Sequence, residues 1–173
     1  MLFSRRLMKI SLHGNSNTAI AVAGNGVAGL ASDQLYEPWG MFVDRKLNLY
    51  VADSGNHRTQ FFRKGQISGE TVAGHGVPND LQLDYSTDIG IDFNNYIYLT
   101  DSEYQRVIRS RNGQYRCLLG CTNKSALLPI NQLDWINSIR FDSYGHLYVL
   151  HETNPRLQKF ELINTGCGMD IEQ

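Results

Sequence analysis

The sequence has no apolar run that approaches the roughly 18–20 residues of a membrane-spanning segment. It also lacks an excess of either charge, because 16 Lys and Arg against 17 Asp and Glu give a net charge of −1. Such a balance argues against a dedicated polyanion-binding protein. Arg5, Arg6 and Lys9 interrupt any signal-peptide core near the start. No stretch shows helical spacing of apolar residues, which leaves β-strands as the expected element.

Cysteine is scarce, with only Cys117, Cys121 and Cys167. The spacing of the first two would suit half of a metal site or a local disulfide, but no second Cys/His pair follows at zinc spacing. We therefore interpret all three as ordinary buried or surface thiols. Asn123-Lys-Ser125 is a formal glycosylation acceptor of a kind that arises often by chance, so the sequence leaves the compartment open.

A tyrosine-centred segment occurs three times, as Leu49–Asp53, Ile97–Asp101 and Leu147–His151. Its tyrosines are 48 and 50 residues apart, an aspartate precedes each by six residues, and an arginine follows each by eight. A period near 50 residues indicates a repeat architecture, and side chains that recur in every unit are interpreted as structural. This structural set is Asp44, Tyr50, Asp53, Arg58, Asp92, Tyr98, Asp101, Arg106, Asp142 and Tyr148.

One unit consists of four short β-prone segments separated by turns: Trp39–Asp44, Leu49–Asp53, Arg58–Phe62 and Glu70–Ala73. Four such strands form an antiparallel meander that cannot bury both of its faces alone. Meanders stacked face to face around an axis bury them, and this arrangement is a β-propeller of typically four to eight blades. The sequence therefore predicts an all-β fold of four-stranded antiparallel blades.

The predicted propeller segment fills the chain as one domain. It comprises a partial blade at 4–24, whole blades at 35–74 and 83–120, and a partial blade at 133–163. Arg6 lies 52 residues before Arg58, in the equivalent place, so the chain is expected to begin inside an earlier unit. We expect it to be part of a longer propeller. The alternative is self-association of two copies that together complete one ring.

The units resemble the NHL repeat, most closely at Pro38–Asp44 and Leu49–Arg58. The resemblance covers residues 4–163 and implies the six-bladed propeller that most family members form. It weakens along the chain: Asn56-His57 becomes Tyr104-Gln105 and then Asn154-Pro155, and Asp53 is replaced by His151 in the third unit.

Gly24-x-Gly26-x-x-Gly29, with Asp44 further on, imitates a dinucleotide-binding fingerprint. The first half recurs at Gly74 and Gly76, and no helix follows that could bind a pyrophosphate. We therefore interpret these residues as turn glycines between blades and predict no cofactor.

Each recurrent arginine has a candidate carboxylate, as in Asp53 with Arg58, and a bidentate pair of this kind suits a turn or a junction between blades. A row of anion-binding arginines is the alternative. Arg156 is the exception, because His151 stands where its acid is expected, and we expect this arginine to be available to another partner.

RNA is a further alternative, since some NHL propellers bind RNA through a basic surface. The densest basic and aromatic segment contains Arg106, Arg109, Arg111 and Arg116 with Tyr104 and Tyr115. Arginine and aromatic rings suit single strands, but the overall charge and the alternating pattern favour a solvated strand face.

Metal-dependent catalysis is the third possibility, because similar propellers include a peptide-amidating lyase and calcium-dependent lactonases. The five histidines fall in predicted turns or in the repeat itself, except His151. We assign no metal ligand and no catalytic residue.

The favoured interpretation is a non-catalytic scaffold for protein–protein interaction, and it rests on the resemblance. The expected contact surface lies at the turns 54–57, 102–105 and 152–155 and at two tryptophans. Its candidate residues are Trp39, Asn56, His57, Tyr104, Trp135, His151 and Arg156.

Overall fold

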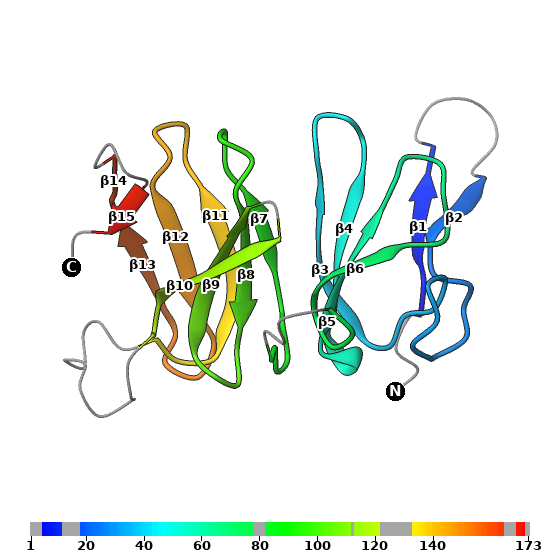
Figure 1. The fold of residues 1–173 in the computed structure, drawn as a ribbon, viewed down its shortest axis with the longest axis horizontal. Helices are drawn as coiled ribbons and strands as arrows, with labels where there is room; N and C mark the ends of the chain where they lie inside the picture. Colours follow the sequence, from blue (N-terminus) through cyan, green and yellow to red (C-terminus); the bar gives the residue numbers. More distant parts are fainter. Residues whose placement is uncertain are drawn as a thin grey trace. The chain divides into compact units, whose positions relative to one another are not determined.

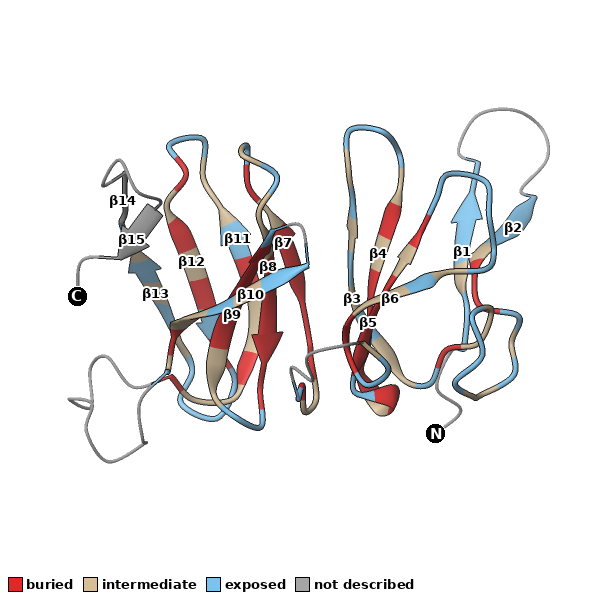
Figure 2. Cartoon of the chain, in the orientation of Figure 1, coloured by how far each residue is buried: buried red, intermediate tan, exposed pale blue. Residues whose placement is uncertain are grey.

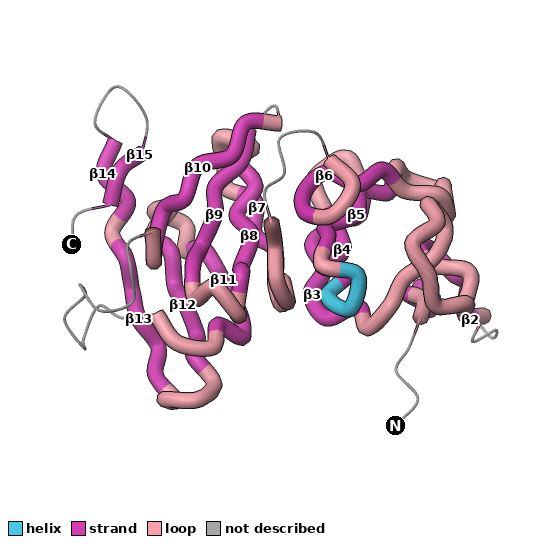
Figure 3. The backbone as a smooth tube through the Cα atoms, turned by 60° about the horizontal axis from the view of Figure 1, so that its bottom comes forward, coloured by secondary structure: helices cyan, strands magenta, loops and turns pink. Residues whose placement is uncertain are grey.

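The computed structural model describes residues 5–11, 18–77, 82–111, 113–121, 133–164 and 169–171 (Figure 1). The chain divides into two compact units, Met1–Gln82 and Leu83–Gln173. Regular structure in the described residues is β, apart from the short 3-10 turn η1 (Ser54–Asn56), which is cyan in Figure 3.

Unit 1 contains a two-stranded sheet and a complete four-stranded blade. The small sheet pairs β1 (Leu7–Ile10) with β2 (Ala19–Ala23). The blade has the strand order β3-β4-β5-β6, and every neighbouring pair is antiparallel. Its strands are β3 (Pro38–Val43), β4 (Leu49–Asp53), β5 (Arg58–Phe62) and β6 (Glu70–Gly74).

Unit 2 contains a complete blade, a three-stranded sheet and a small hairpin. The blade is formed by β7 (Ile89–Ile91), β8 (Ile97–Asp101), β9 (Arg106–Arg111) and β10 (Gln114–Leu119). The three-stranded sheet is formed by β11 (Ile136–Phe141), β12 (Leu147–His151) and β13 (Arg156–Phe160). The partial blade expected at 133–163 thus contains three strands up to Phe160. Leu162–Asn164 (β14) instead pairs with Met169–Ile171 (β15).

The prediction of an all-β fold built from four-stranded antiparallel blades is confirmed. The described residues contain two whole blades and parts of two others. The strands form at the tyrosine-centred segments because these are rich in β-branched and aromatic residues, and Gly, Asn and Asp fill the turns between them.

Each unit has its own core where its two larger sheets meet. Leu35, Leu49, Val51 and Phe62 form the core of unit 1. In unit 2 the buried side chains come from both the blade and the three-stranded sheet, and Tyr98 contacts Phe141 edge-on with 4.6 Å between ring centroids. Figure 2 shows buried stretches on β4, β8 and β12, whereas β1 is largely exposed. Burial of these apolar surfaces is the main force that holds each pair of sheets together.

A polar contact joins the two sheets of unit 2. Asp88 is buried just before β7, and one of its carboxylate oxygens accepts hydrogen bonds from the Ser138 hydroxyl at 2.7 Å and the Ile139 N–H at 2.9 Å. The Arg140 guanidinium also donates to this oxygen. The charge of Asp88 is thereby satisfied by the neighbouring sheet.

The recurrent aspartates fix the turn between the first and second strands of each larger sheet. One carboxylate oxygen of Asp44 accepts the N–H groups of Lys46 and Asn48, both at 2.8 Å. Asp92 and Asp142 each accept the N–H groups two and four residues on, all at 2.9 Å. This is the local side-chain-to-backbone bonding that makes Asp favourable in turns.

The recurrent tyrosines explain why the period includes a Tyr six residues after the Asp. The hydroxyl of Tyr98 donates to the second carboxylate oxygen of Asp92 at 3.0 Å, and Tyr148 donates to Asp142 at 3.2 Å. In unit 1 the Asn48 side chain takes this place on Asp44, at 2.9 Å. Tyr50 instead contacts the Phe61 ring, with centroids 4.9 Å apart.

A glycine with a positive φ stands at the end of the last strand in three sheets: β1–β2, β3–β6 and β7–β10. Gly74 has φ +85°, and a Cβ there would lie 2.2 Å from the carbonyl oxygen of His57, directly before the adjacent strand β5. Gly24 and Gly120 show the same left-handed backbone and the same collision with a backbone oxygen. The first glycine of the fingerprint, Gly24, therefore marks a close approach between two backbones.

We predict that Gly74→Ala costs substantially more stability than Gly76→Ala. Gly76 has φ +98° and no atom within 4 Å of the position that a Cβ would take, so its substitution costs only backbone strain of about 1–2 kcal/mol. Gly74→Ala adds a backbone collision, worth about 1–3 kcal/mol more. Urea unfolding of both variants measures the difference, and equal costs would contradict the close approach.

Candidate functional site

The turn between β4 and β5 is held by a buried ion pair. The Arg58 Nε donates to Asp53 Oδ2 at 2.8 Å, and the guanidinium also donates to the carbonyl oxygens of Leu30, Ala31 and Gln34 at 2.7–3.1 Å. Asp53 Oδ1 accepts the Tyr36 N–H at 2.7 Å. The pair thus ties the loop that enters the blade to the blade itself, and these contacts lie within the fold rather than toward a bound anion.

Asn56 was predicted at the contact surface, but the structure buries it, with an exposed fraction of 9%. Its amide donates to Asp53 Oδ2 at 2.8 Å and to the Gly29 carbonyl oxygen at 2.9 Å. The side chain is therefore part of the same clamp, and the prediction is wrong for this residue.

Exposed residues surround the clamp at this end of the unit 1 blade. His57 follows η1 in a left-handed conformation and is exposed. Trp39 is 49% exposed and follows Pro38, which pairs with Asp53. Tyr36 is also exposed, and its ring packs so closely on Gly55 that a Cβ there would lie 2.5 Å away. Trp39 and His57 therefore lie at the blade end where the contact surface is expected.

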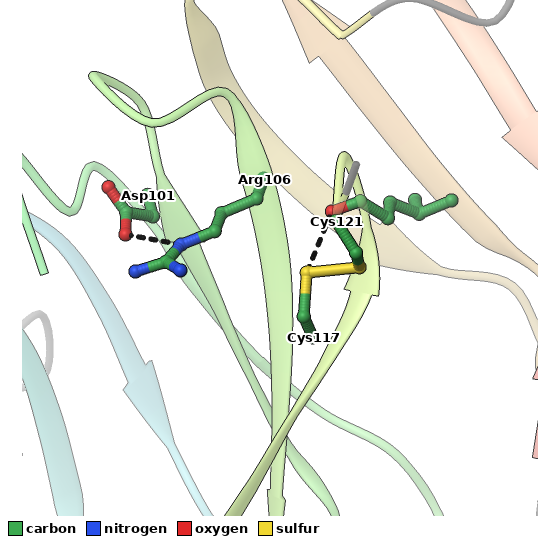
Figure 4. Close-up of a disulfide and its surroundings, with 5 residues drawn as sticks. Asp101, Arg106, Cys117 and Cys121 are labelled. Atoms are coloured by element: carbon green, nitrogen blue, oxygen red, sulfur yellow. Dashed lines mark hydrogen bonds and ion pairs between the residues drawn. A yellow bond between two sulfur atoms is a disulfide. The ribbon is translucent and has the colours of Figure 1, made fainter. Parts of the chain in front are cut away.

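Unit 2 repeats the clamp in a more open form. The Arg106 Nε donates to Asp101 Oδ2 at 2.9 Å, as Figure 4 shows, while Asp101 Oδ1 accepts the Asp84 N–H at 3.2 Å. The Arg106 guanidinium lies over the Tyr104 ring, 4.9 Å from its centroid. Burial raises the pKa of the Asp101 carboxyl above its ordinary value, although the bond from Arg106 opposes this. Tyr104 itself is 45% exposed.

A second pair of aromatic rings lies at the same end of unit 2. Trp135 and Tyr85 have centroids 5.6 Å apart, and both are half-buried. The Tyr85 carbonyl oxygen accepts the Ser102 N–H, and the Trp135 carbonyl oxygen accepts the Glu152 N–H. These bonds place both rings beside the turns that were predicted to form the contact surface.

Tyr36 and Tyr85 were not among the predicted surface residues. Each lies within three residues of a recurrent Gln-Leu pair, at Gln34-Leu35 and Gln82-Leu83. That recurrence is the sequence signal that could have identified them.

His151 is buried rather than exposed, with an exposed fraction of 2%, so its predicted place on the surface is wrong. The Asp134 N–H donates to its Nδ1 at 3.1 Å, which requires that this nitrogen carry no proton. Burial, and then the positive charge of Arg156, lower the pKa of His151 below its ordinary value. The imidazole is therefore held in its neutral form.

Arg156 was expected to be available to another partner. The structure pairs it in register with His151, where its positive charge, after burial, lowers the pKa of the imidazole. His151 thus accepts the Asp134 N–H, as Asp53 accepts the Tyr36 N–H in the unit 1 blade.

Cys117 and Cys121 form a disulfide at the end of β10, with Cα atoms 5.6 Å apart (Figure 4). The interpretation of these two residues as ordinary thiols is therefore wrong. Cys167, Asn123 and Ser125 lie outside the described residues. Across the part of the chain that the structure describes, no three His, Cys, Asp or Glu side chains gather as a metal site would require.

The sequence profile of the NHL repeat matches residues 35–60, which span the first three strands of the unit 1 blade and the Asp53–Arg58 clamp. Residues 35–60 are thus an NHL-repeat segment. The resemblance noted from the sequence is thus confirmed for the segment in which it is strongest. A search of curated proteins finds no significant match.

Solved structures with the same fold are propellers of diverse kinds. A nidogen/laminin complex matches with 17% identity and a TM-score of 0.65, over 91% of this chain and 55% of that one. A gluconolactonase from Xanthomonas campestris matches with 12% identity and a TM-score of 0.56, over 82% and 48%. An inactive virginiamycin B lyase from Staphylococcus aureus with quinupristin matches with 11% identity and a TM-score of 0.57, over 96% and 58%.

At these identities the likeness concerns the fold alone. The chain spans about half the length of the solved structures that it matches. Among the described residues, no helix has the length and apolar character needed to cross a membrane.

We predict that Asp53→Ala lowers the free energy of unfolding by about 3–5 kcal/mol, because it leaves the buried Arg58 guanidinium without its carboxylate. The matched control is Arg63→Ala, which breaks an ion pair to Glu70 whose side chains are 59% and 63% exposed. That change should stay within about 0.5 kcal/mol, because solvent screens exposed pairs. Urea unfolding measures both, and similar losses would contradict the clamp.

We predict that His151 makes the chain less stable in mild acid. The folded-state pKa of His151 lies below its ordinary value of 6.5, so the unfolded chain takes up the proton first. Stability is then full above about pH 6.5 and is lost as pH falls toward the lowered pKa. Thermal melting at about pH 7.5 and about pH 5.5 should show a smaller drop in Tm for His151→Gln than for the unchanged chain.

The control for this prediction is His57→Gln, which alters an exposed histidine. It should leave the drop in Tm between the two pH values unchanged. An equal drop in the His151→Gln variant would show that another group causes the acid sensitivity.

Proposed function

We propose that the chain is a non-catalytic NHL-type β-propeller scaffold that binds another protein through the turn ends of its blades. The supporting observation is a division between two sets of side chains. The recurrent charged residues at these turns, such as Asp53 and Arg58, are engaged in bonds inside the blades. The aromatic residues beside them, such as Trp39 and Tyr104, remain exposed.

Exposed aromatic rings and a stacked arginine are the chemistry of a protein-binding surface. Trp, Tyr and Arg are enriched among the residues that dominate binding energy at interfaces. In unit 2 the rings of Tyr104 and Trp135 are held by Arg106 and Tyr85, respectively, so they lose little freedom on binding. The likeness to a propeller in a nidogen/laminin complex agrees with this role at the level of the fold.

A metal-dependent propeller enzyme is the second candidate. The observation in its favour is the likeness to a gluconolactonase and to a virginiamycin B lyase. Elemental analysis of the purified chain separates the two candidates, because a resident zinc or calcium ion at one per chain would favour the enzyme.

The six-bladed ring and its completion belong to the same proposal. The remaining blades would come from further residues of a longer protein or from a second copy of this chain. Sedimentation of the purified chain distinguishes these sources, because only the second gives a well-folded dimer.

We predict that Tyr104→Ser combined with Trp135→Ser weakens capture of the partner by more than tenfold, because interface aromatics are each worth about 2 kcal/mol or more. The measurement is quantitative mass spectrometry of proteins captured from an extract, followed by titration of the purified candidate. The matched control is Tyr144→Ser, which removes a ring that is 84% exposed in the opposite turn, between β11 and β12.

A partner that is lost from the double variant but retained by Tyr144→Ser supports the proposal. Capture that is equal across all variants would contradict the assignment of the surface.

A further inference from the structure

The outer strands of the unit 2 blade carry a pocket that the proposed function does not use. It has a volume of about 270 Å³. The residues that line it are Tyr96, Arg109, Arg111, Gln114, Tyr115 and Arg116. Three of the six are arginines, and none is acidic.

Strand register places the three arginines on one face of the sheet. Arg116 pairs directly with Arg109 across β9 and β10, and Gln114 pairs with Arg111. Residues opposite each other in antiparallel strands point to the same face, as do residues two apart along a strand. Like charges directly opposite each other destabilise a sheet. A local cost of this kind is typical of a functional constraint.

The Tyr96 ring contacts two of the three arginines. The guanidinium carbon of Arg109 lies 4.7 Å from the centroid of the Tyr96 ring, and that of Arg111 lies 4.8 Å from it. One ring thus contacts two cations, and this attraction offsets part of their mutual repulsion. Two of the three guanidinium groups are therefore ordered before a ligand arrives, which reduces the entropy lost on binding.

The carboxylate of Asp92, behind the Tyr98 hydroxyl, is already engaged within the fold. Arg109 pairs in register with Tyr98, and its charge lowers the otherwise raised pKa of the Tyr98 hydroxyl, so the two groups are close. The Tyr98 hydroxyl in turn donates to Asp92. Arg111 and Arg116 are exposed on the same face.

Planar guanidinium groups match the oxygen geometry of sulfate and phosphate esters and bind them through paired N–H donors. The neighbouring residue on β10 helps to choose between these two anions. Cys117, directly after Arg116, forms a disulfide with Cys121. Disulfides persist in oxidising surroundings outside the cytosol, where sulfated saccharides are the common polyanionic ligands.

We propose that this pocket binds the sulfate groups of a sulfated saccharide. The net charge of −1 provides no chain-wide attraction for polyanions, so binding is confined to the pocket. This site lies on the outer strands of the blade. It is separate from the turn-end surface and goes beyond the protein-binding role.

Calorimetric titration of the full chain with a short heparin fragment tests the proposal. The fragment should bind, and Arg111→Gln and Arg116→Gln should each weaken it about tenfold, the loss expected when one charge-assisted contact is removed. Affinity should fall steeply with salt for the unchanged chain and less steeply for either variant. Tyr96→Leu should also weaken binding, because it frees the two guanidinium groups that the ring orders.

The matched control is Arg45→Gln, which removes the same charge from an exposed turn of unit 1 and should change the affinity by less than about twofold. Circular dichroism melting confirms that each variant is folded. Arg111 and Arg116 are exposed, so loss of binding without loss of fold is the expected result.

Four outcomes overturn the proposal. The first is that the heparin fragment does not bind, and the second is that a desulfated fragment binds equally well. The third is that inorganic phosphate displaces the fragment at equal concentration, which would make this a simple oxyanion site. The fourth is that single-stranded RNA binds more tightly with the same dependence on Arg111 and Arg116.

Discussion

The blades depend on carboxylates that are buried and fully satisfied by groups of the fold. Asp53 accepts bonds from Arg58, Asn56 and the Tyr36 N–H, while Arg58 donates to three carbonyl oxygens of the entering loop. The strand pairing of a four-stranded meander does not by itself fix the loop that enters it. Charge-assisted bonds from loop to blade fix that loop, because leaving any of these groups buried and unpaired is costly.

The same constraint limits what the repeated residues can do chemically. The Asp88 carboxylate in unit 2 accepts hydrogen bonds from the neighbouring sheet. The carboxylates of three other aspartates accept turn N–H groups: Asp44, Asp92 and Asp142. A side chain that stabilises the fold in this way is poorly placed to exchange protons or to bind a ligand. The residues proposed here for binding, such as Tyr104 and Arg116, are instead ones that do not recur in the repeat.

Much of the fold could be predicted because its signals are local. The tyrosine-centred strands and the Asp that precedes each turn involve residues within six positions of one another. The candidate surface was harder to predict, because Asn56 is buried by a bond to Gly29, 27 residues earlier. His151 is likewise buried against Asp134, 17 residues away. Such distant partners leave no trace in a short motif. The disulfide and the pairing of Arg109 with Arg116 depend on hairpin register, which β10 interrupts with an irregularity between Cys117 and Leu119.

The position of β10 at the edge of its sheet bears on aggregation. This strand is the outermost of its blade, so one side of its backbone has no neighbour within that sheet. An unpaired edge strand can form hydrogen bonds with a strand of another polypeptide. Positive side chains on it oppose that association through repulsion and hydration. The arginines of this hairpin would thus oppose aggregation through the edge of the sheet. Substitutions that neutralise these arginines, made to aid solubility or crystallisation, would remove this protection from the edge strand.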